Sequence, residues 1–408
     1  MDARGAVNIL LVSDVSMTTI LGGAERILYE HSTRLQAQGH HVVVLSRKVS
    51  DACSKTMTIS GVQVIHFEVD RRNPFAFLVS SLWNAAQAYR QIAREITFDL
   101  VCFHQPLSAM GVTLVSKRTR LPATYTFQSP AFLEYQMRHP TRRSLEFARA
   151  IHFNLLRWIE RHCLQRCHKI VVMSHYMKEL VQQHHAVPEE RISIVPGGVD
   201  LQRFTPAQHR GALRRWLKLP EKGCLLLTIR NLEARMGLPN LLEAMKLLNP
   251  EAEEISLIIG GSGSQREALQ ELKSRLGLEG RVEFRGQIPE DELAGYYQAS
   301  DFFILPTREL EGFGLVTVEA LACGTPVLGT PVGGTPEILR PLRSDLLFPG
   351  TDPDAIAKVI LEHRHRLRSD PDGYQDLRDA CRRHALDRYA WAPLIKALEA
   401  VLLKAAES

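Results

Sequence analysis

The sequence predicts an α/β protein made of two domains, each with a parallel sheet covered by helices on both faces. Three observations predict it. Short apolar runs alternate with helical periodicity along most of the chain, which is typical of parallel sheets. Most of these runs end in a polar or glycine-rich loop that leads into a helix. The length of 408 residues exceeds the size at which one hydrophobic core keeps growing.

The first half of the chain contains a series of candidate strands. They are residues 7–13, 41–46, 62–67, 99–104, 123–128, 169–173 and 191–195. Ser174 follows one of them and is a natural N-cap for the next helix. The segment Pro196–Asp200, with a proline and two glycines, interrupts the pattern. We therefore place a domain boundary there and assign residues 1–200 to an N-terminal domain.

The second half repeats the alternation. Its candidate strands are residues 224–230, 255–260, 281–286, 301–306 and 325–330. A wholly helical pattern follows Asp352. We assign residues 201–385 to a C-terminal domain and residues 386–408 to a last helix.

The composition excludes several classes of protein. A net charge of +5, with 45% hydrophobic and 23% charged residues, is ordinary for a globular enzyme and does not predict a nucleic-acid-binding protein. No apolar run is long enough to span a bilayer. Residues 7–12 are too short for a signal peptide and are interpreted as a buried strand. The cysteines match neither a disulfide framework nor a paired zinc motif, which favours a reducing cytoplasm.

A basic amphipathic segment covers residues 142–169. Its cations are Arg142, Arg143, Arg149, Arg157, Arg161, Arg166 and Lys169. Such a helix can lie on anionic lipid headgroups, which predicts peripheral contact with the inner face of the cell membrane. A packed helix with a solvated basic face explains the pattern equally well, so both interpretations stay open.

The most informative segment is Glu311–Val327, with the sequence EGFGLVTVEALACGTPV. It places Glu311 and Glu319 eight positions apart around a glycine-rich turn that leads into an apolar helix. We expect Glu311 in the loop and Glu319 on the helix. Carboxylates placed in this way can accept hydrogen bonds from the vicinal hydroxyls of a ribose or a hexose.

This segment resembles the signature of retaining glycosyltransferases of family 4, and the resemblance covers most of the chain. It implies the GT-B architecture, in which two Rossmann-like doubly wound domains face a central cleft. The second domain then binds a nucleotide-diphosphate sugar, the first binds the acceptor, and the last helix packs back on the first domain. The resemblance also implies that Glu311 contacts the donor sugar and Glu319 the ribose.

Two glycine pairs are expected close to the donor. Gly22 and Gly23, in LGGAER, open a helix, where free N–H groups favour phosphate, and the resemblance places them over the donor phosphates. Gly333 and Gly334, in TPVGGTPEIL, belong to a loop that the resemblance also places near the donor.

A third glycine-rich loop, in IIGGSGSQREALQ, contains Gly261 and Gly263. A dinucleotide fingerprint would need another glycine where this chain has Arg266, so an NAD site is disfavoured. The loop fits the nucleotide domain of family 4 instead. By the same resemblance, Gln287 and Ile288 at the end of the next strand hold the base.

The leaving diphosphate gains negative charge as the glycosidic bond breaks, so a cation must lie beside it. Arg230 and Arg235 are the candidates. The commonest family pattern has an arginine and a lysine at positions where this chain has Asn231 and Met236. We expect the two neighbouring arginines to supply the charge.

The acceptor side departs from the family as well. Gln128 stands where members often carry a histidine, and an amide can bind a sugar hydroxyl but cannot act as a base. The resemblance implies that the donor phosphate serves as the base instead. His104, Glu134 and Tyr135 are the other candidate acceptor contacts.

The sequence therefore predicts a metal-independent hexosyltransferase that uses a UDP- or GDP-sugar and needs no other cofactor, since no metal motif is evident. The expected acceptor is a glycan or a lipid-linked sugar in cell-envelope polysaccharide assembly. Two alternatives remain. A nucleotide-sugar epimerase of the same fold would convert donor alone, and a catalytically weak sugar-nucleotide-binding protein is suggested by Gln128, Asn231 and Met236.

Overall fold

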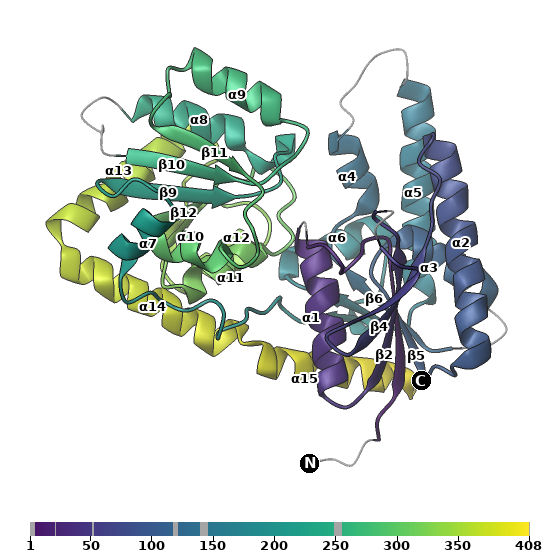
Figure 1. Cartoon of the computed structure of the whole chain (residues 1–408). Coiled ribbons are helices and arrows are strands. Elements are labelled where there is room, and N and C mark those ends of the chain that lie inside the picture. The colour runs from purple at the N-terminus through teal and green to yellow at the C-terminus, as the bar shows by residue number, and fades with distance from the viewer. Residues whose placement is uncertain are drawn as a thin grey trace. The chain divides into compact units, whose positions relative to one another are not determined.

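The computed structural model describes residues 5–20, 22–50, 53–116, 121–138, 146–248 and 255–407. The chain divides into two compact units (Figure 1). Unit 1 comprises Met1–Pro196 together with Ala392–Ser408, and unit 2 comprises Gly197–Trp391. Each unit is built on its own largely parallel sheet with helices around it. The predicted α/β class with two doubly wound sheets is confirmed.

The sheet of unit 1 has the order β3-β4-β2-β1-β5-β6-β7-β8. Its strands are β1 (Asn8–Ser13), β2 (His41–Arg47), β3 (Thr56–Ile59), β4 (Val62–Phe67), β5 (Leu100–Phe103), β6 (Ala123–Phe127), β7 (Lys169–Val172) and β8 (Ile192–Ile194). All neighbouring strands are parallel except β3 and β4. The strand order reverses between β1 and β5, so the carboxyl ends of these two strands flank the position where such sheets bind ligands.

Strand β3 pairs antiparallel with β4 and is not among the strands predicted above. Ser60 and Gly61 join the two strands with positive φ angles of 48° and 82°. Two consecutive residues with positive φ form the tight turn that suits a β-hairpin. The Ser-Gly pair was the available signal, but the run before it is too short to show clear alternation.

The helices of unit 1 connect and cover these strands. They are α1 (Gly23–Ala37), α2 (Pro74–Glu95), α3 (Pro106–Ser116), α4 (Ala131–Arg138), α5 (Glu146–Arg166), α6 (His175–His185) and α15 (Trp391–Ala406). The predicted cap at Ser174 is confirmed, because its hydroxyl accepts a hydrogen bond of 3.1 Å from the Met177 amide at the start of α6. Asn73 caps α2 in the same way.

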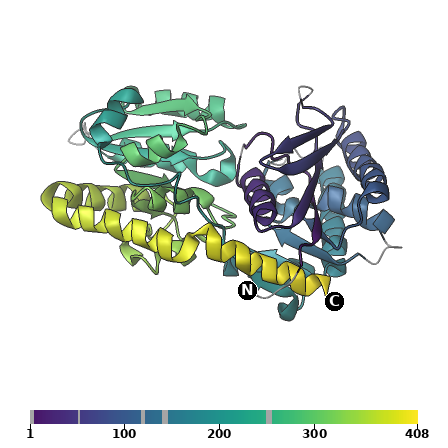
Figure 2. The ribbon, with the colours of Figure 1, turned by 60° about the horizontal axis from the view of Figure 1, so that its bottom comes forward.

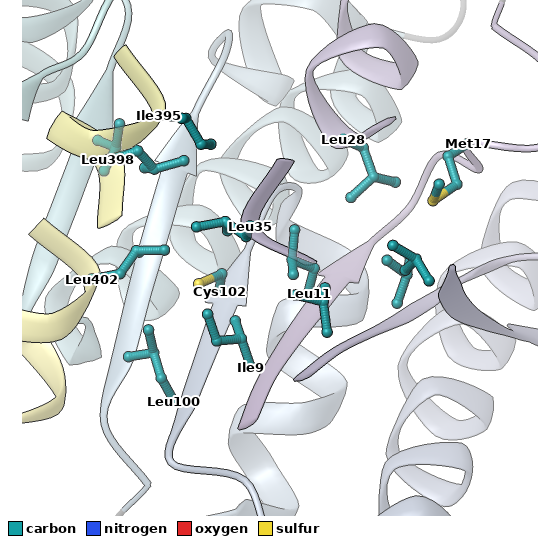
Figure 3. Close-up of a cluster of buried hydrophobic side chains, with 14 of the residues drawn as sticks. Ile9, Leu11, Met17, Leu28, Leu35, Leu100, Cys102, Ile395, Leu398 and Leu402 are labelled. Carbon is teal, nitrogen blue, oxygen red and sulfur yellow. The ribbon is translucent and has the colours of Figure 1, made fainter. Parts of the chain in front are cut away.

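The last helix of the chain belongs to unit 1 over most of its length. Figure 2 shows α15, the yellow helix at the end of the chain, beside unit 1, and Figure 3 shows Ile395, Leu398 and Leu402 beside Leu100 and Cys102. These side chains belong to one buried cluster that also includes residues of α1, β1 and β2. Burying a side chain such as Leu398 contributes about 1.5–3 kcal/mol to the stability of the unit.

Unit 2 contains a fully parallel sheet with the order β11-β10-β9-β12-β13. The strands are β9 (Cys224–Ile229), β10 (Ile255–Gly260), β11 (Val282–Gly286), β12 (Phe302–Leu305) and β13 (Val327–Gly329). The helices are α7 (Arg210–Trp216), α8 (Leu238–Leu247), α9 (Arg266–Arg275), α10 (Leu293–Ala299), α11 (Leu315–Ala322), α12 (Thr335–Leu339), α13 (Pro353–Ser369) and α14 (Pro371–Tyr389). Here the strand order reverses between β9 and β12, so the loops after these strands flank the crevice where doubly wound sheets bind ligands.

Candidate active site

Arg230 and Glu311 meet at this reversal of strand order in unit 2. Arg230 directly follows β9, and Glu311 lies in the loop between β12 and α11. A guanidinium Nη2 of Arg230 donates to Oε2 of Glu311 over 2.6 Å, and the two side chains are only 5% and 9% exposed. The structure thus brings together a predicted phosphate-binding cation and the predicted sugar-binding carboxylate.

The Glu311 carboxylate is held in its charged form. Burial by itself raises the pKa of Glu311, but the charge and hydrogen bond of Arg230 act in the opposite direction. The Thr307 hydroxyl donates a further hydrogen bond of 2.8 Å to Oε2, and Arg235 adds attraction. The pKa of Glu311 therefore lies below its usual value, so the group is a hydrogen-bond acceptor at neutral pH.

The rest of the Arg230 guanidinium has capacity for a ligand. Nη2 also contacts the Met236 sulfur at 2.9 Å, so the residue that replaces the family lysine packs on this arginine. Nη1 is buried and has no hydrogen-bond partner among the described residues. A buried guanidinium N–H group without an acceptor is costly, and an anionic oxygen at this position would satisfy it.

Arg235 lies in a one-turn 3₁₀ helix, Ala234–Met236, and its guanidinium has a different partner from that of Arg230. Its Nη1 donates to the Leu310 carbonyl over 2.7 Å. Its own carbonyl accepts the amides of Arg308 and Glu309. Arg235 therefore ties the loop after β9 to the loop that carries Glu311, besides contributing positive charge.

Glu319 lies on α11, as predicted, and faces α10. It is buried, and its Oε2 accepts a hydrogen bond of 2.9 Å from the Tyr297 hydroxyl. Tyr297 and Thr307 are contacts of the two acidic residues that were not predicted. Thr307 follows the end of a predicted strand, which was the available signal, whereas nothing near Glu319 in the sequence points to Tyr297.

The glycine loops approach the backbone of both members of the ion pair. Gly261 has φ of +120°, and a Cβ there would lie 1.9 Å from the Arg230 carbonyl oxygen. Gly333 has φ of +60°, and a Cβ there would lie 2.1 Å from the Glu311 carbonyl oxygen. The Gly334 amide donates to that same oxygen over 2.9 Å. Only glycine allows these contacts, so the two loops fix the positions of Arg230 and Glu311.

The remaining donor-side residues lie around this edge or in unit 1. A Cβ at Gly263 would meet the Leu232 backbone at 2.5 Å, so this loop also presses on the segment after β9. Gln287 is exposed and Ile288 is buried just after β11. Gly23 opens α1 in unit 1 and Gly22 is its extended N-cap.

In unit 1, His104 and Gln128 lie together. The amide nitrogen of Gln128 is 3.2 Å from Nδ1 of His104, at the carboxyl ends of β5 and β6. The His104 ring also meets the ring of His31 on α1 edge to face, with centroids 5.7 Å apart. His31 was not predicted, because its buried position on α1 gives no signal in the sequence.

Both imidazoles of this pair are neutral. Burial lowers the pKa of His31 to about 3. Burial, with a smaller effect of His31, places the pKa of His104 well below its usual value. Nε2 of His104 is buried and has no partner among the described residues. His104 can therefore take part in a hydrogen bond with a hydroxyl, but it is a weak base.

Glu134 and Tyr135 lie on α4 and are half-buried. The Tyr135 ring stacks on His152 of α5, with centroids 4.2 Å apart. Tyr135 is thus part of the packing between α4 and α5. Across the described ranges, no group of three or more His, Cys, Asp or Glu side chains is arranged to hold a metal ion.

Comparison with known proteins agrees with this fold. A family model described as Glycosyl transferases group 1 matches residues 210–378, and one described as Glycosyltransferase Family 4 matches residues 21–203. A D-inositol 3-phosphate glycosyltransferase of Streptomyces scabiei is 30% identical over 356 residues, which cover 83% of this chain and 78% of that protein.

Two solved structures show the same fold. Sucrose-phosphate synthase from Thermosynechococcus elongatus has a TM-score of 0.84 at 22% identity and covers 98% of both chains. The Anabaena HepE protein, in complex with UDP-glucose, has a TM-score of 0.75 at 18% identity, covering 98% of this chain and 100% of its own. Fold and site define a GT-B glycosyltransferase. The chain belongs to glycosyltransferase family 4.

Proposed function

We propose that the chain transfers a hexose from a UDP-sugar to an acceptor hydroxyl with retention of anomeric configuration and without a metal ion. The observation that carries the proposal is the buried Arg230–Glu311 pair at the reversal of strand order in unit 2. A UDP-sugar is favoured over a GDP-sugar because the HepE structure contains UDP-glucose.

Each of the site residues of unit 2 would have its own role in the transfer reaction. Glu311 accepts a hydrogen bond from a hydroxyl of the donor hexose, and Glu319 accepts one from the ribose. Arg230, through its buried Nη1, and Arg235 neutralise the diphosphate as the bond to the sugar breaks. Charge that a metal ion would otherwise supply comes from these two arginines.

The reaction also needs a base that accepts the proton of the acceptor hydroxyl. Gln128 cannot accept it, and the lowered pKa of His104 makes that imidazole a poor base. The departing diphosphate oxygen is then the base: the bond from C1 to this oxygen breaks, the acceptor oxygen bonds to C1 on the same face, and its proton moves to the diphosphate.

A panel of nucleotide sugars tests the donor. We expect UDP-sugars to raise the melting temperature, because a ligand at 100 times its Kd adds about 2.7 kcal/mol to stability. GDP-, ADP- and CMP-sugars at the same concentration should give smaller shifts, and EDTA should change neither binding nor transfer. A larger shift with a GDP-sugar would reassign the donor, and product formed from donor alone would favour the epimerase.

We also propose that unit 1 contacts the inner face of the cell membrane and that the acceptor is a lipid-linked glycan of the cell envelope. The exposed large hydrophobic side chains of unit 1, within its described residues, all lie on α2, α3 and α5, of which α3 packs against both others. They are Phe75, Val79, Trp83, Leu114, Ile151 and Trp158. Exposed Arg161 and Arg166 on α5 add positive charge that anionic lipids attract.

The predicted basic segment accounts for only part of this surface. Arg142 and Arg143 lie outside the described residues. Arg157 is half-buried over the Phe132 ring, and Lys169, at the start of β7, donates to the Glu190 carbonyl. These two cations therefore serve packing within unit 1. None of the helices that the structure describes is long and apolar enough to cross a membrane.

Vesicle sedimentation tests the membrane contact. The chain should sediment with phosphatidylglycerol vesicles, and Trp83→Ser/Trp158→Ser should lower the partition coefficient by about tenfold or more, since each tryptophan supplies apolar area at the interface. Trp216→Ser is the matched control, because Trp216 is equally exposed but lies in unit 2. Equal sedimentation of all three proteins would contradict the proposal.

A further inference from the structure

Unit 2 contains a small cavity at the opposite end of its sheet from the candidate active site. The cavity is lined by residues 206–208, Arg210 and Gly324 and by the part of α14 around Arg378. Arg210 donates to the Ser300 carbonyl over 2.8 Å, just before β12 begins, whereas the candidate active site follows the ends of β9 and β12. The volume of about 250 Å³ is smaller than that of most sites for drug-sized ligands but leaves room for a compact ion.

One buried carboxylate neutralises two arginines beside this cavity. Asp301, directly before β12, accepts a hydrogen bond of 2.6 Å from Arg210 at Oδ1 and one of 2.8 Å from Arg214 at Oδ2. The Leu225 amide also donates to Oδ2, over 2.7 Å. Both oxygens of this carboxylate therefore already have partners.

Arg378 is the third arginine of this region and has no counter-charge. It is only 5% exposed. Its Nη1 donates to the Tyr374 hydroxyl over 3.3 Å, and it forms no ion pair and no other hydrogen bond among the described residues. Burial raises the pKa of Tyr374 to about 12, so the phenol stays neutral and supplies no negative charge. A buried guanidinium without an anion is costly, and a bound anion would remove that cost.

Both arginines that line the cavity have N–H groups available for a ligand. Nη1 of Arg210, like Nε and Nη2 of Arg378, has no hydrogen-bond partner in the described part of the chain, and none of these nitrogens is fully buried. Asp379 is the lining carboxylate, but it is exposed and accepts a hydrogen bond of 3.0 Å from the Gln375 amide. Two guanidinium groups around one small space fit the oxygens of a tetrahedral anion.

We propose that this cavity binds a compact tetrahedral oxyanion, such as inorganic phosphate or sulfate, through Arg378 and Arg210. The anion supplies the counter-charge that Arg378 lacks within the described residues. The site is separate from the nucleotide-sugar donor site, because no lining residue is among the donor contacts assigned above.

Calorimetric titration of the full chain with sodium phosphate and with sodium sulfate tests the site, with sodium chloride at the same ionic strength as the salt control. Saturating UDP is present, so that the probe does not compete for the diphosphate position. Arg378→Met removes the buried charge, and Gln208→Glu adds a carboxylate at an exposed position of the lining. Arg383→Gln is the matched control, because Arg383 is exposed on the same helix and does not line the cavity.

We expect phosphate and sulfate to bind and chloride not to bind. Each cavity variant should weaken the binding by about tenfold or more, with little effect of Arg383→Gln. Absence of binding by both oxyanions at millimolar concentration, or unchanged affinity in either cavity variant, would overturn the proposal. Should Arg378→Met fail to fold, Gln208→Glu decides the question, because it leaves the buried arginines unchanged. The binding is measured without transferase activity, so the proposed function is tested separately.

Discussion

Replacing Glu311 by glutamine is expected to lower kcat/KM for the donor sugar by about a hundredfold or more and to destabilise unit 2 by about 3–5 kcal/mol. Glutamine keeps the shape of the side chain but removes its charge. The hydrogen bond to the donor hexose is then weaker, and the buried Arg230 guanidinium loses its counter-charge. Initial rates at varied donor concentration and urea unfolding measure the two effects.

Two further variants separate activity from stability. Arg230→Gln/Glu311→Gln should recover most of the lost stability, because no buried charge is left unpaired, but should recover no activity. Glu309→Gln is the matched control, since Glu309 lies two residues away in the same loop and is exposed. Full activity of Glu311→Gln would show that Glu311 does not contact the donor. Recovery of activity in the double variant would show that the Arg230–Glu311 pair has only a structural role.

Replacing Gly261 by alanine should be almost as damaging, although no functional group is lost. The added Cβ would lie 1.9 Å from the Arg230 carbonyl oxygen, at a φ of +120° that side chains rarely adopt. The backbone of Arg230 must move, and its guanidinium moves with it. We expect a loss of at least about 3 kcal/mol in stability and about a hundredfold in kcat/KM.

Gly280→Ala provides the comparison for this effect. Gly280 also has a positive φ, of +79°, but nothing lies within 4 Å of the position of its Cβ. It should show only the smaller cost of the unfavourable φ, about 1–2 kcal/mol, and nearly normal activity. If Gly261→Ala behaved like Gly280→Ala, the close packing of the glycine loop on Arg230 would have no role in the site.

The fold class follows from the sequence because most of the buried strands of these sheets contain a short apolar run before a polar or glycine-rich loop. The same pattern located Glu311 in a loop and Glu319 on a helix, and the structure has both there. Strand β3 was missed because four residues at the sheet edge carry too little periodicity.

The contacts within the site could not be predicted in the same way. Arg230 and Glu311 are 81 positions apart, and their contact depends on β9 and β12 being neighbours in the sheet. Strand order is not contained in local periodicity. The same holds for Tyr297, whose hydroxyl reaches Glu319 from another helix, and for His31, which lies against His104.

Amide hydrogen exchange with and without a UDP-sugar tests the central claim most directly, because it locates the donor without any substitution. The account predicts slower exchange on donor binding in the segments that follow the strands of unit 2, including the first turns of α11. These segments are residues 230–237, 260–265, 286–288, 306–319 and 330–335. Protection confined to unit 1, or donor binding that leaves the exchange of these loops unchanged, would contradict the assignment of the Arg230–Glu311 pair to the donor site.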